Sequence, residues 1–212
     1  MLSATYRTVK GYGEARTEIE KSLFICYAAR AETEAEAQAF VAQIRKKHAD
    51  ATHNCAAYLV GEAPGLQKAD DDGEPSGTAG RPMLEIIKKT GLRDTVLVVT
   101  RYFGGIKLGA GGLIRAYGKS ASTGLKAAGI VERNLHRQLA IMIDYPLLGN
   151  VENQLKVHQY TISAKEFAQQ ITLNVLEPEG ENRLTQQVAD WTSGLARVVP
   201  AGEIYVDTVI ED

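Results

Sequence analysis

The last third of the chain carries a hydrophobic pattern that fits few folds. Within residues 136–212, apolar side chains alternate in some segments and recur at helical spacing in others. The expected elements are a strand over 139–145, a helix from Pro146 to Leu155, a hairpin over 160–167 and 170–176, a helix over 184–191 and a strand over 197–206. This β-α-β-β-α-β order predicts a ferredoxin-like domain. Trp191 shares a helix face with Leu184 and Val188, so we expect it in the core rather than in a binding site.

The part before residue 136 also mixes strand and helix patterns. Strands are expected near Tyr6–Glu14, Ser22–Ala29, His53–Val60 and Thr95–Arg101. Gly11 and Gly13 suggest a bend or bulge in the first of these stretches. Helices are expected after a capping box of Thr33 and Glu36, from Pro82 to about Gly91, and from about Leu113 to Ala128, with a long loop over Gly61–Arg81. Strands and helices in both parts place the chain in the α+β class.

Glycine content and charge change at about the same place in the chain. Residues 1–135 hold 16 of the 20 glycines and have 19 basic and 15 acidic side chains, a net charge of +4. Residues 136–212 have 5 basic and 11 acidic side chains, a net charge of −6. We therefore expect two domains, 1–135 and 136–212. The whole-chain charge of −2 excludes a globally basic nucleic-acid binder but not a local basic patch.

Cysteine usage and hydropathy narrow the class of protein. Cys26 and Cys55 are too few for a disulfide framework or a structural zinc site, and we expect half-buried thiols. The first 20 residues carry six charged side chains around no apolar core, which excludes a secretory signal. The most apolar stretch, Thr95–Thr100, is far shorter than the roughly 20 residues that span a bilayer. We predict a cytoplasmic protein, and we expect no metal and no cofactor.

A glycine-rich segment is the first candidate for function. Five of the nine residues from Gly104 to Gly112 are glycine, and such a loop before a helix lets several N–H groups point at an anion. The helix is expected to bury Leu113, Ile114, Tyr117, Ala121 and Leu125 and to expose a basic stripe. The residues expected to bind an anion or nucleic acid are Arg101, Gly104, Gly105, Lys107, Gly109, Gly111, Gly112, Arg115 and Lys119. The segment matches neither the Walker A nor the G-x-G-x-x-G pattern, so tight packing with a solvated basic face is the alternative.

The acidic run from Asp70 to Pro82 is the second candidate. The residues singled out in it are Asp72, Glu74, Ser76, Gly77, Thr78 and Arg81. Three interpretations are open. Its carboxylates are ligands that Mg²⁺ accepts, its Ser76–Gly80 segment extends the anion-binding loop, or the run is a mobile surface loop. The sequence also leaves open whether Asp72 and Glu74 face Arg101 or Arg115, a pairing that would neutralise the basic surface.

Nucleophilic catalysis has weak support. His53 and Cys55 are two residues apart in an expected strand, so their side chains share a face. A Cys-His pair also needs a group that orients the base, and the sequence supplies none. We assign no catalytic residue.

Both candidate segments resemble the IMPACT family, and closely its bacterial YigZ-type members. The resemblance rests on the runs Asp71–Pro82 (DDGEPSGTAGRP) and Val99–Leu113 (VTRYFGGIKLGAGGL), and it covers essentially the whole chain. It implies that the first domain has the α/β fold shared by a ribosomal-protein domain (domain-2-like) and by several small-molecule kinases. It also implies that the second domain is akin to the last domain of elongation factor G.

The resemblance implies a function linked to translation. Eukaryotic relatives are translational regulators, and bacterial ones are suspected of contacting RNA or the ribosome. The leading hypothesis is therefore a non-enzymatic regulator that binds RNA, the ribosome or a translation-related protein. The alternatives are an enzyme acting on a phosphorylated small molecule or nucleotide, and a pure protein-interaction module.

Overall fold

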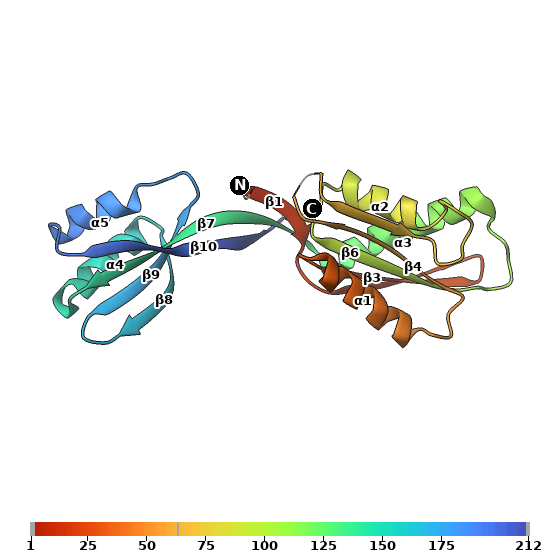
Figure 1. Ribbon diagram of the computed structural model, residues 1–212, viewed down its shortest axis with the longest axis horizontal. Coiled ribbons are helices and arrows are strands. Elements are labelled where there is room, and N and C mark those ends of the chain that lie inside the picture. Colours follow the sequence, from red (N-terminus) through yellow and green to blue (C-terminus); the bar gives the residue numbers. More distant parts are fainter. Residues whose placement is uncertain (1–2, 63, 211–212) are drawn as a thin grey trace. The chain divides into compact units, whose positions relative to one another are not determined.

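The computed structural model describes residues 3–62 and 64–210 and divides the chain into two compact units (Figure 1). The first unit runs to Glu132 and is joined by the chain from Asp207 onward, and the second unit is Arg133–Val206. We expected one domain over 136–212, whereas here the chain returns to the first unit after Val206.

The first unit is built on an antiparallel sheet with the strand order β2-β3-β6-β4-β5. Its elements are β1 (Thr5–Val9), β2 (Gly13–Ile19), β3 (Ser22–Arg30), α1 (Glu34–Lys47), β4 (His53–Val60), β5 (Leu66–Asp70), α2 (Gly80–Lys89), β6 (Thr95–Tyr102) and α3 (Gly109–Ala128). One expectation was wrong, because the expected loop Gly61–Arg81 contains β5. The stretch Tyr6–Glu14 is divided between β1 and β2 near Gly11 and Gly13, where a bend or bulge was expected.

Helices cover both faces of this sheet (Figure 1). On one face α2 and α3 bury a core that includes Met83, Ile87 and Leu125, while on the other face α1 packs Val41 and Ile44 against the strands. Strand β6 lies in the middle of the sheet and is buried from Thr95 to Arg101, as a strand covered on both faces requires. The capping box of α1 is confirmed, because Thr33 Oγ1 accepts the Glu36 N–H at 3.2 Å.

The second unit has the expected β-α-β-β-α-β order. Its elements are β7 (Ile130–Ile143, which begins in the first unit and also pairs with β1), a 3₁₀ turn (Tyr145–Leu147), α4 (Leu148–Val157), β8 (Thr161–Phe167), β9 (Ile171–Pro178), α5 (Leu184–Thr192) and β10 (Arg197–Val209). The strands lie in the order β10-β7-β9-β8, and α4 and α5 share one core with the sheet. Trp191 packs partly buried against that core and stacks on His158. Among the described residues, no helix is long and apolar enough to span a membrane.

The start of α5 is fixed by a buried carboxylate, Glu177. Its Oε1 accepts the N–H groups of Arg183 at 2.6 Å and Leu184 at 2.7 Å, and the Arg137 guanidinium pairs with Oε2. Burial by itself raises the pKa of Glu177, but the Leu184 N–H, the Arg137 guanidinium and the Arg183 N–H together hold that pKa below its usual value.

We expect Glu177→Gln to lower the free energy of unfolding of the second unit by about 1.5–3 kcal/mol at neutral pH. A carboxyl whose pKa is lowered by folding stabilises the native state above its unfolded pKa, and this contribution disappears as the pH falls through the folded pKa. The stabilities of wild type and variant should therefore converge in acid. Urea unfolding followed by the fluorescence of the single tryptophan, Trp191, reports on this unit. A difference that stays constant from pH 7 to acid would contradict the assignment.

Candidate functional site

The two candidate segments lie side by side in the structure. Glu74 and Pro75, from the acidic run, line an open hollow of about 320 Å³ together with residues from the end of β6 and the start of α3. The other lining residues are Arg101, Phe103, Lys107, Leu108, Gly109, Ala110 and Leu113. Two segments that are separate in the sequence thus form one surface feature.

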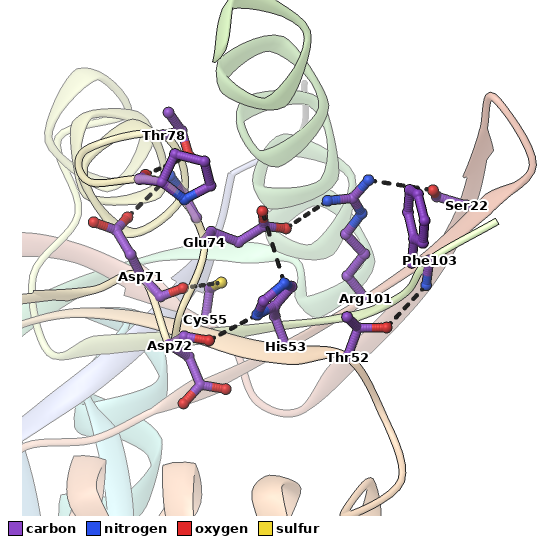
Figure 2. A network of polar contacts seen from close by, with 12 residues as sticks. Ser22, Thr52, His53, Cys55, Asp71, Asp72, Glu74, Thr78, Arg101 and Phe103 are labelled. Atoms are coloured by element: carbon purple, nitrogen blue, oxygen red, sulfur yellow. Dashed lines mark hydrogen bonds and ion pairs between the residues drawn. The ribbon is translucent and has the colours of Figure 1, made fainter. Parts of the chain in front are cut away.

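Two of the residues that line this hollow, Glu74 and Arg101, form a buried ion pair (Figure 2). Arg101 Nη1 donates to Glu74 Oε1 at 2.7 Å, and the two side chains are 6% and 3% exposed. The Tyr117 hydroxyl donates to the same oxygen at 2.7 Å, and Arg101 Nη2 reaches Ser22 Oγ at 3.4 Å. The sequence left open whether Glu74 faces Arg101 or Arg115, and in the structure it faces Arg101 and balances its charge inside the protein.

Aromatic rings hold the Arg101 guanidinium in place. Its central carbon lies 5.3 Å from the ring centroids of both Phe24 and Phe103. Phe24 is buried, whereas Phe103 is 45% exposed. The Arg101 Nε is buried without a hydrogen-bond partner in the part of the chain that the structure describes. Phe103 therefore lies at the surface, and the cation–π contact with the Arg101 guanidinium holds its ring in position.

The Asp71 carboxylate accepts hydrogen bonds from backbone N–H groups that, on one interpretation of the sequence, would bind an external anion. Its Oδ1 accepts the N–H groups of Ala79 at 3.0 Å and Gly80 at 2.8 Å, and its Oδ2 accepts that of Gly77 at 2.7 Å. These groups stand at the start of α2, where a negative charge is stabilised by the helix dipole. The carboxylate of the chain itself therefore takes the place of a ligand here.

The remaining acidic side chains also have partners within the protein. Arg45 pairs with Asp70 at 2.9 Å and with Asp72 at 3.1 Å, and Asp72 also accepts the Asn54 N–H. Asp72 thus faces Arg45, neither Arg101 nor Arg115. Over residues 3–62 and 64–210, no group of three His, Cys, Asp or Glu side chains is arranged to hold a metal ion.

Three other residues of the acidic run are placed apart from the hollow. Thr78 is buried and donates its hydroxyl to the Pro75 carbonyl at 2.6 Å. Ser76 and Arg81 are exposed and do not line the hollow. The acidic run therefore contributes to the site mainly through Glu74 and Pro75.

The glycines of the first segment have different structural roles. A Cβ on Gly104 would lie 1.9 Å from the Lys21 carbonyl oxygen, and the Gly104 N–H donates to Ser22 Oγ, so this glycine serves chain packing. Gly105 and Gly109 have φ values of +86° and +67°, which favour glycine. Helix α3 begins at Gly109, four residues earlier than expected, so Gly109, Gly111 and Gly112 form its first turn.

The start of α3 differs from that of α2. Its N-cap residue, Leu108, makes no side-chain cap, and among the described residues no carboxylate takes the place that Asp71 has at the start of α2. The first N–H groups of a helix lack partners within the helix and carry partial positive charge. This end of α3 therefore favours negative charge.

Three cations of the expected site are unpaired and close together. Lys107, Arg115 and Lys119 line an open groove of about 460 Å³ that also contains Glu20 and several apolar residues. Within the described ranges, none of the three has a carboxylate at ion-pair distance. We call this feature the basic groove.

The loop before α3 and the helix itself also carry exposed apolar side chains. Ile114 was expected in the core but is 45% exposed, whereas Leu113, Tyr117, Ala121 and Leu125 are buried as expected. Ile114 follows Leu113 by one residue, or about 100° around the helix, which carries it past the buried face. Phe103, which lines the hollow, and Ile106, which lines the basic groove, are exposed apolar side chains as well.

His53 and Cys55 do not form a nucleophilic pair. The His53 Nδ1 donates to the Asp72 carbonyl oxygen, and the Cys55 Sγ–H points to the Asp71 carbonyl oxygen at 3.0 Å (Figure 2). Burial, together with nearby carboxylates, raises the pKa of the Cys55 thiol. Burial likewise raises that of Cys26, to about 12. Both thiols are fully buried rather than half-buried, and a buried protonated thiol is a weak nucleophile.

Comparisons with known proteins agree with this arrangement. The model of the Impact N-terminal domain matches residues 20–125, and a domain of unknown function, DUF1949, matches residues 141–195. The chain is 48% identical to the IMPACT family member YvyE of Bacillus subtilis, covering 97% of this chain and 95% of the relative. It is 32% identical to the IMPACT family member YigZ of Escherichia coli, covering 88% and 93%.

A solved structure shares the fold. The crystal structure of a hypothetical protein, 30% identical, superposes with a TM-score of 0.62 and covers 93% of this chain and 98% of that chain. Protein IMPACT of Bos taurus matches over a shorter stretch, 40% identical over 30% of this chain and 20% of that protein. From the domain matches and the near full-length relatives, the chain belongs to the IMPACT family, as a member of the bacterial YigZ type.

Proposed function

We propose that this protein is a non-enzymatic, translation-associated factor that binds RNA, free or on the ribosome, through the basic groove. The observation that carries the proposal is the set of three exposed cations, Lys107, Arg115 and Lys119, left without carboxylate partners in the described structure. Cations that are not neutralised internally are available to phosphate groups.

The start of α3 adds to the attraction for phosphate. Lys107 lies just before the first turn, so the uncapped N–H groups and the side-chain charge act on the same region. Arg101 no longer belongs to the binding set, because Glu74 balances it. Gly104 also leaves the set, while Gly109, Gly111 and Gly112 stay in it through the N–H groups of the first turn of α3, and Gly105 contributes backbone shape.

Two glycines of α3 support close approach of a partner. A Cβ on Gly111 would make only an ordinary contact with Arg115, and one on Gly118 would meet nothing within 4 Å. Neither has a positive φ, so the helix does not require them, although each glycine costs about 1 kcal/mol relative to alanine. Both lie on the Arg115 side of the helix, where the absence of side chains lets a phosphate backbone approach.

Family membership supports the link to translation. The IMPACT family includes eukaryotic translational regulators, as the resemblance of the two motifs implied, and relatives named Protein IMPACT match this chain. The match to them spans 30% of this chain, so their partners are not carried over.

The basic groove predicts a strong salt dependence of RNA binding. Replacement of Lys107, Arg115 and Lys119 by glutamine should lower the slope of log affinity against log salt by up to about three, roughly one for each phosphate contact. Binding to RNA is measured over a salt series by fluorescence anisotropy.

A second triple variant controls for net charge. Lys46, Lys89 and Arg197 are exposed cations on α1, α2 and β10, and their replacement by glutamine removes the same charge elsewhere. We expect it to leave the slope near that of wild type. Equal slopes for the two triple variants would overturn the proposal. It would also be overturned if the protein bound no RNA but retained a protein from a lysate after treatment with nuclease.

A further inference from the structure

We infer that the RNA bound by this protein is single-stranded, with one unpaired base seated in the hollow and the flanking phosphates in the basic groove. This inference rests on the proposed function and adds to it the form of the nucleic acid and a second subsite. The two subsites have different chemistry and are contiguous.

The contiguity follows from shared residues. Lys107 and Leu108 line both the hollow and the basic groove, so the two depressions meet at the loop before α3. A nucleotide places its base on one side of the sugar and its phosphates on the other. The protein surface is divided in the same way, because the apolar hollow lies on one side of Lys107 and Leu108 and the cationic groove lies on the other.

The walls of the hollow suit the flat face of a base. Pro75, Phe103, Leu108 and Leu113 supply apolar surface, and the volume of about 320 Å³ is at the lower end of the range for pockets that hold small organic ligands. Phe103 is 45% exposed and rests on the fixed Arg101 guanidinium. A ring held in this way can stack on a base with little further loss of side-chain entropy.

The polar lining of the hollow includes Glu74, which offers an acceptor for the edge of a base. Glu74 Oε1 is used by Arg101 and Tyr117, but among the described residues Oε2 accepts no hydrogen bond and lies 3.9 Å from His53 Nε2. The Arg101 Nε also lacks a hydrogen-bond partner in the described structure, but it is buried and is not open to a ligand. The edges of bases carry donors as well as acceptors, so the second oxygen of Glu74 suits a donor on a base edge.

A duplex does not satisfy this arrangement. In a duplex the base edges are paired and the faces are stacked on neighbours, so no base is free to enter a hollow. The basic groove alone would bind the phosphates of either form. The preference for single strands therefore comes from the hollow, and Phe103 is its most exposed large ring.

The test compares one RNA sequence in two forms. An unstructured labelled RNA of about 12 nucleotides, within the usual range of single-strand site sizes, is titrated alone and as a duplex with its complement. We expect wild type to favour the single strand. Phe103→Ala should weaken single-strand binding by roughly 5- to 100-fold, the effect of losing one stacked base, while leaving duplex binding nearly unchanged. Phe103→Trp should restore it.

Phe167 provides the matched control. It is an exposed phenylalanine of the second unit, 60% exposed, and Phe167→Ala should not change binding. Equal affinities of wild type for both forms, or equal effects of Phe103→Ala and Phe167→Ala, would overturn this inference while leaving the proposed function in place. If wild type bound neither the single strand nor the duplex, the proposed function itself would be refuted. A mononucleotide that competes as strongly as the oligonucleotide would also contradict a strand as the ligand.

Discussion

Replacement of Arg101 by methionine should lower the free energy of unfolding of the first unit by about 3–5 kcal/mol, the usual cost of removing one partner of a buried ion pair. Methionine fills much of the space of the arginine stem but offers nothing to Glu74, which is only 3% exposed and would keep an uncompensated charge. Among the described residues, the Tyr117 hydroxyl is then the only hydrogen-bond donor left to Oε1. Backbone hydrogen exchange of β6 and α3 measures the loss within this unit.

A double variant separates the ion pair from the packing of the side chain. Glu74→Gln together with Arg101→Met removes both charges, so the double variant should be more stable than Arg101→Met alone. The Trp191 fluorescence transition of the second unit serves as an internal control and should stay in place. A double variant less stable than both single variants would show that the pair is not the main contribution at this position.

Much of the architecture was accessible from local patterns. The order of elements in the second unit follows from alternation and helical spacing, and the structure confirms it down to the buried stripe of Val151, Leu155, Leu184 and Val188. Strand β6 was recognised because a central strand covered on both faces is apolar along its length. Each of these patterns lies within one segment, so it can be recognised from the sequence of that segment alone.

Strand β5 was missed because its sequence contains no such pattern. It is a short edge strand, Leu-Gln-Lys-Ala-Asp, and four of its five residues are exposed. Its position is set by pairing with β4, a contact that is not encoded in its own alternation. Helix α3 began earlier than expected for a related reason, since glycines at 109, 111 and 112 disfavour a helix by propensity alone.

The sequence located the candidate site but did not show which of its charged residues pair with one another. The sequence predicted that the two motifs matter, and the structure shows that both line the hollow. The pairing of Glu74 with Arg101 joins residues 27 apart, which no local spacing reveals. One signal was available. A charged residue at the end of a buried strand requires a partner, and the acidic run held the nearby carboxylates.

Asp71→Ala should be the second most damaging change, with a loss of about 2–4 kcal/mol in the free energy of unfolding, because three N–H groups lose their acceptor at once. Two of these donors, Ala79 and Gly80, are buried, so water does not replace the carboxylate freely. Asp71→Asn keeps a single acceptor oxygen and should have an intermediate effect. Glu18→Ala, which removes an exposed carboxylate of the same unit, should be nearly neutral.

The same change distinguishes the two parts of the proposed RNA site. Asp71 holds the ends of the loop that presents Glu74 and Pro75 to the hollow, whereas Lys107, Arg115 and Lys119 lie on a different segment. At a temperature where Asp71→Ala is still folded, its preference for single-stranded over duplex RNA should fall while its salt slope stays near that of wild type. A variant that loses the slope and keeps the preference would show that the acidic run, rather than the basic groove, governs contact with phosphate.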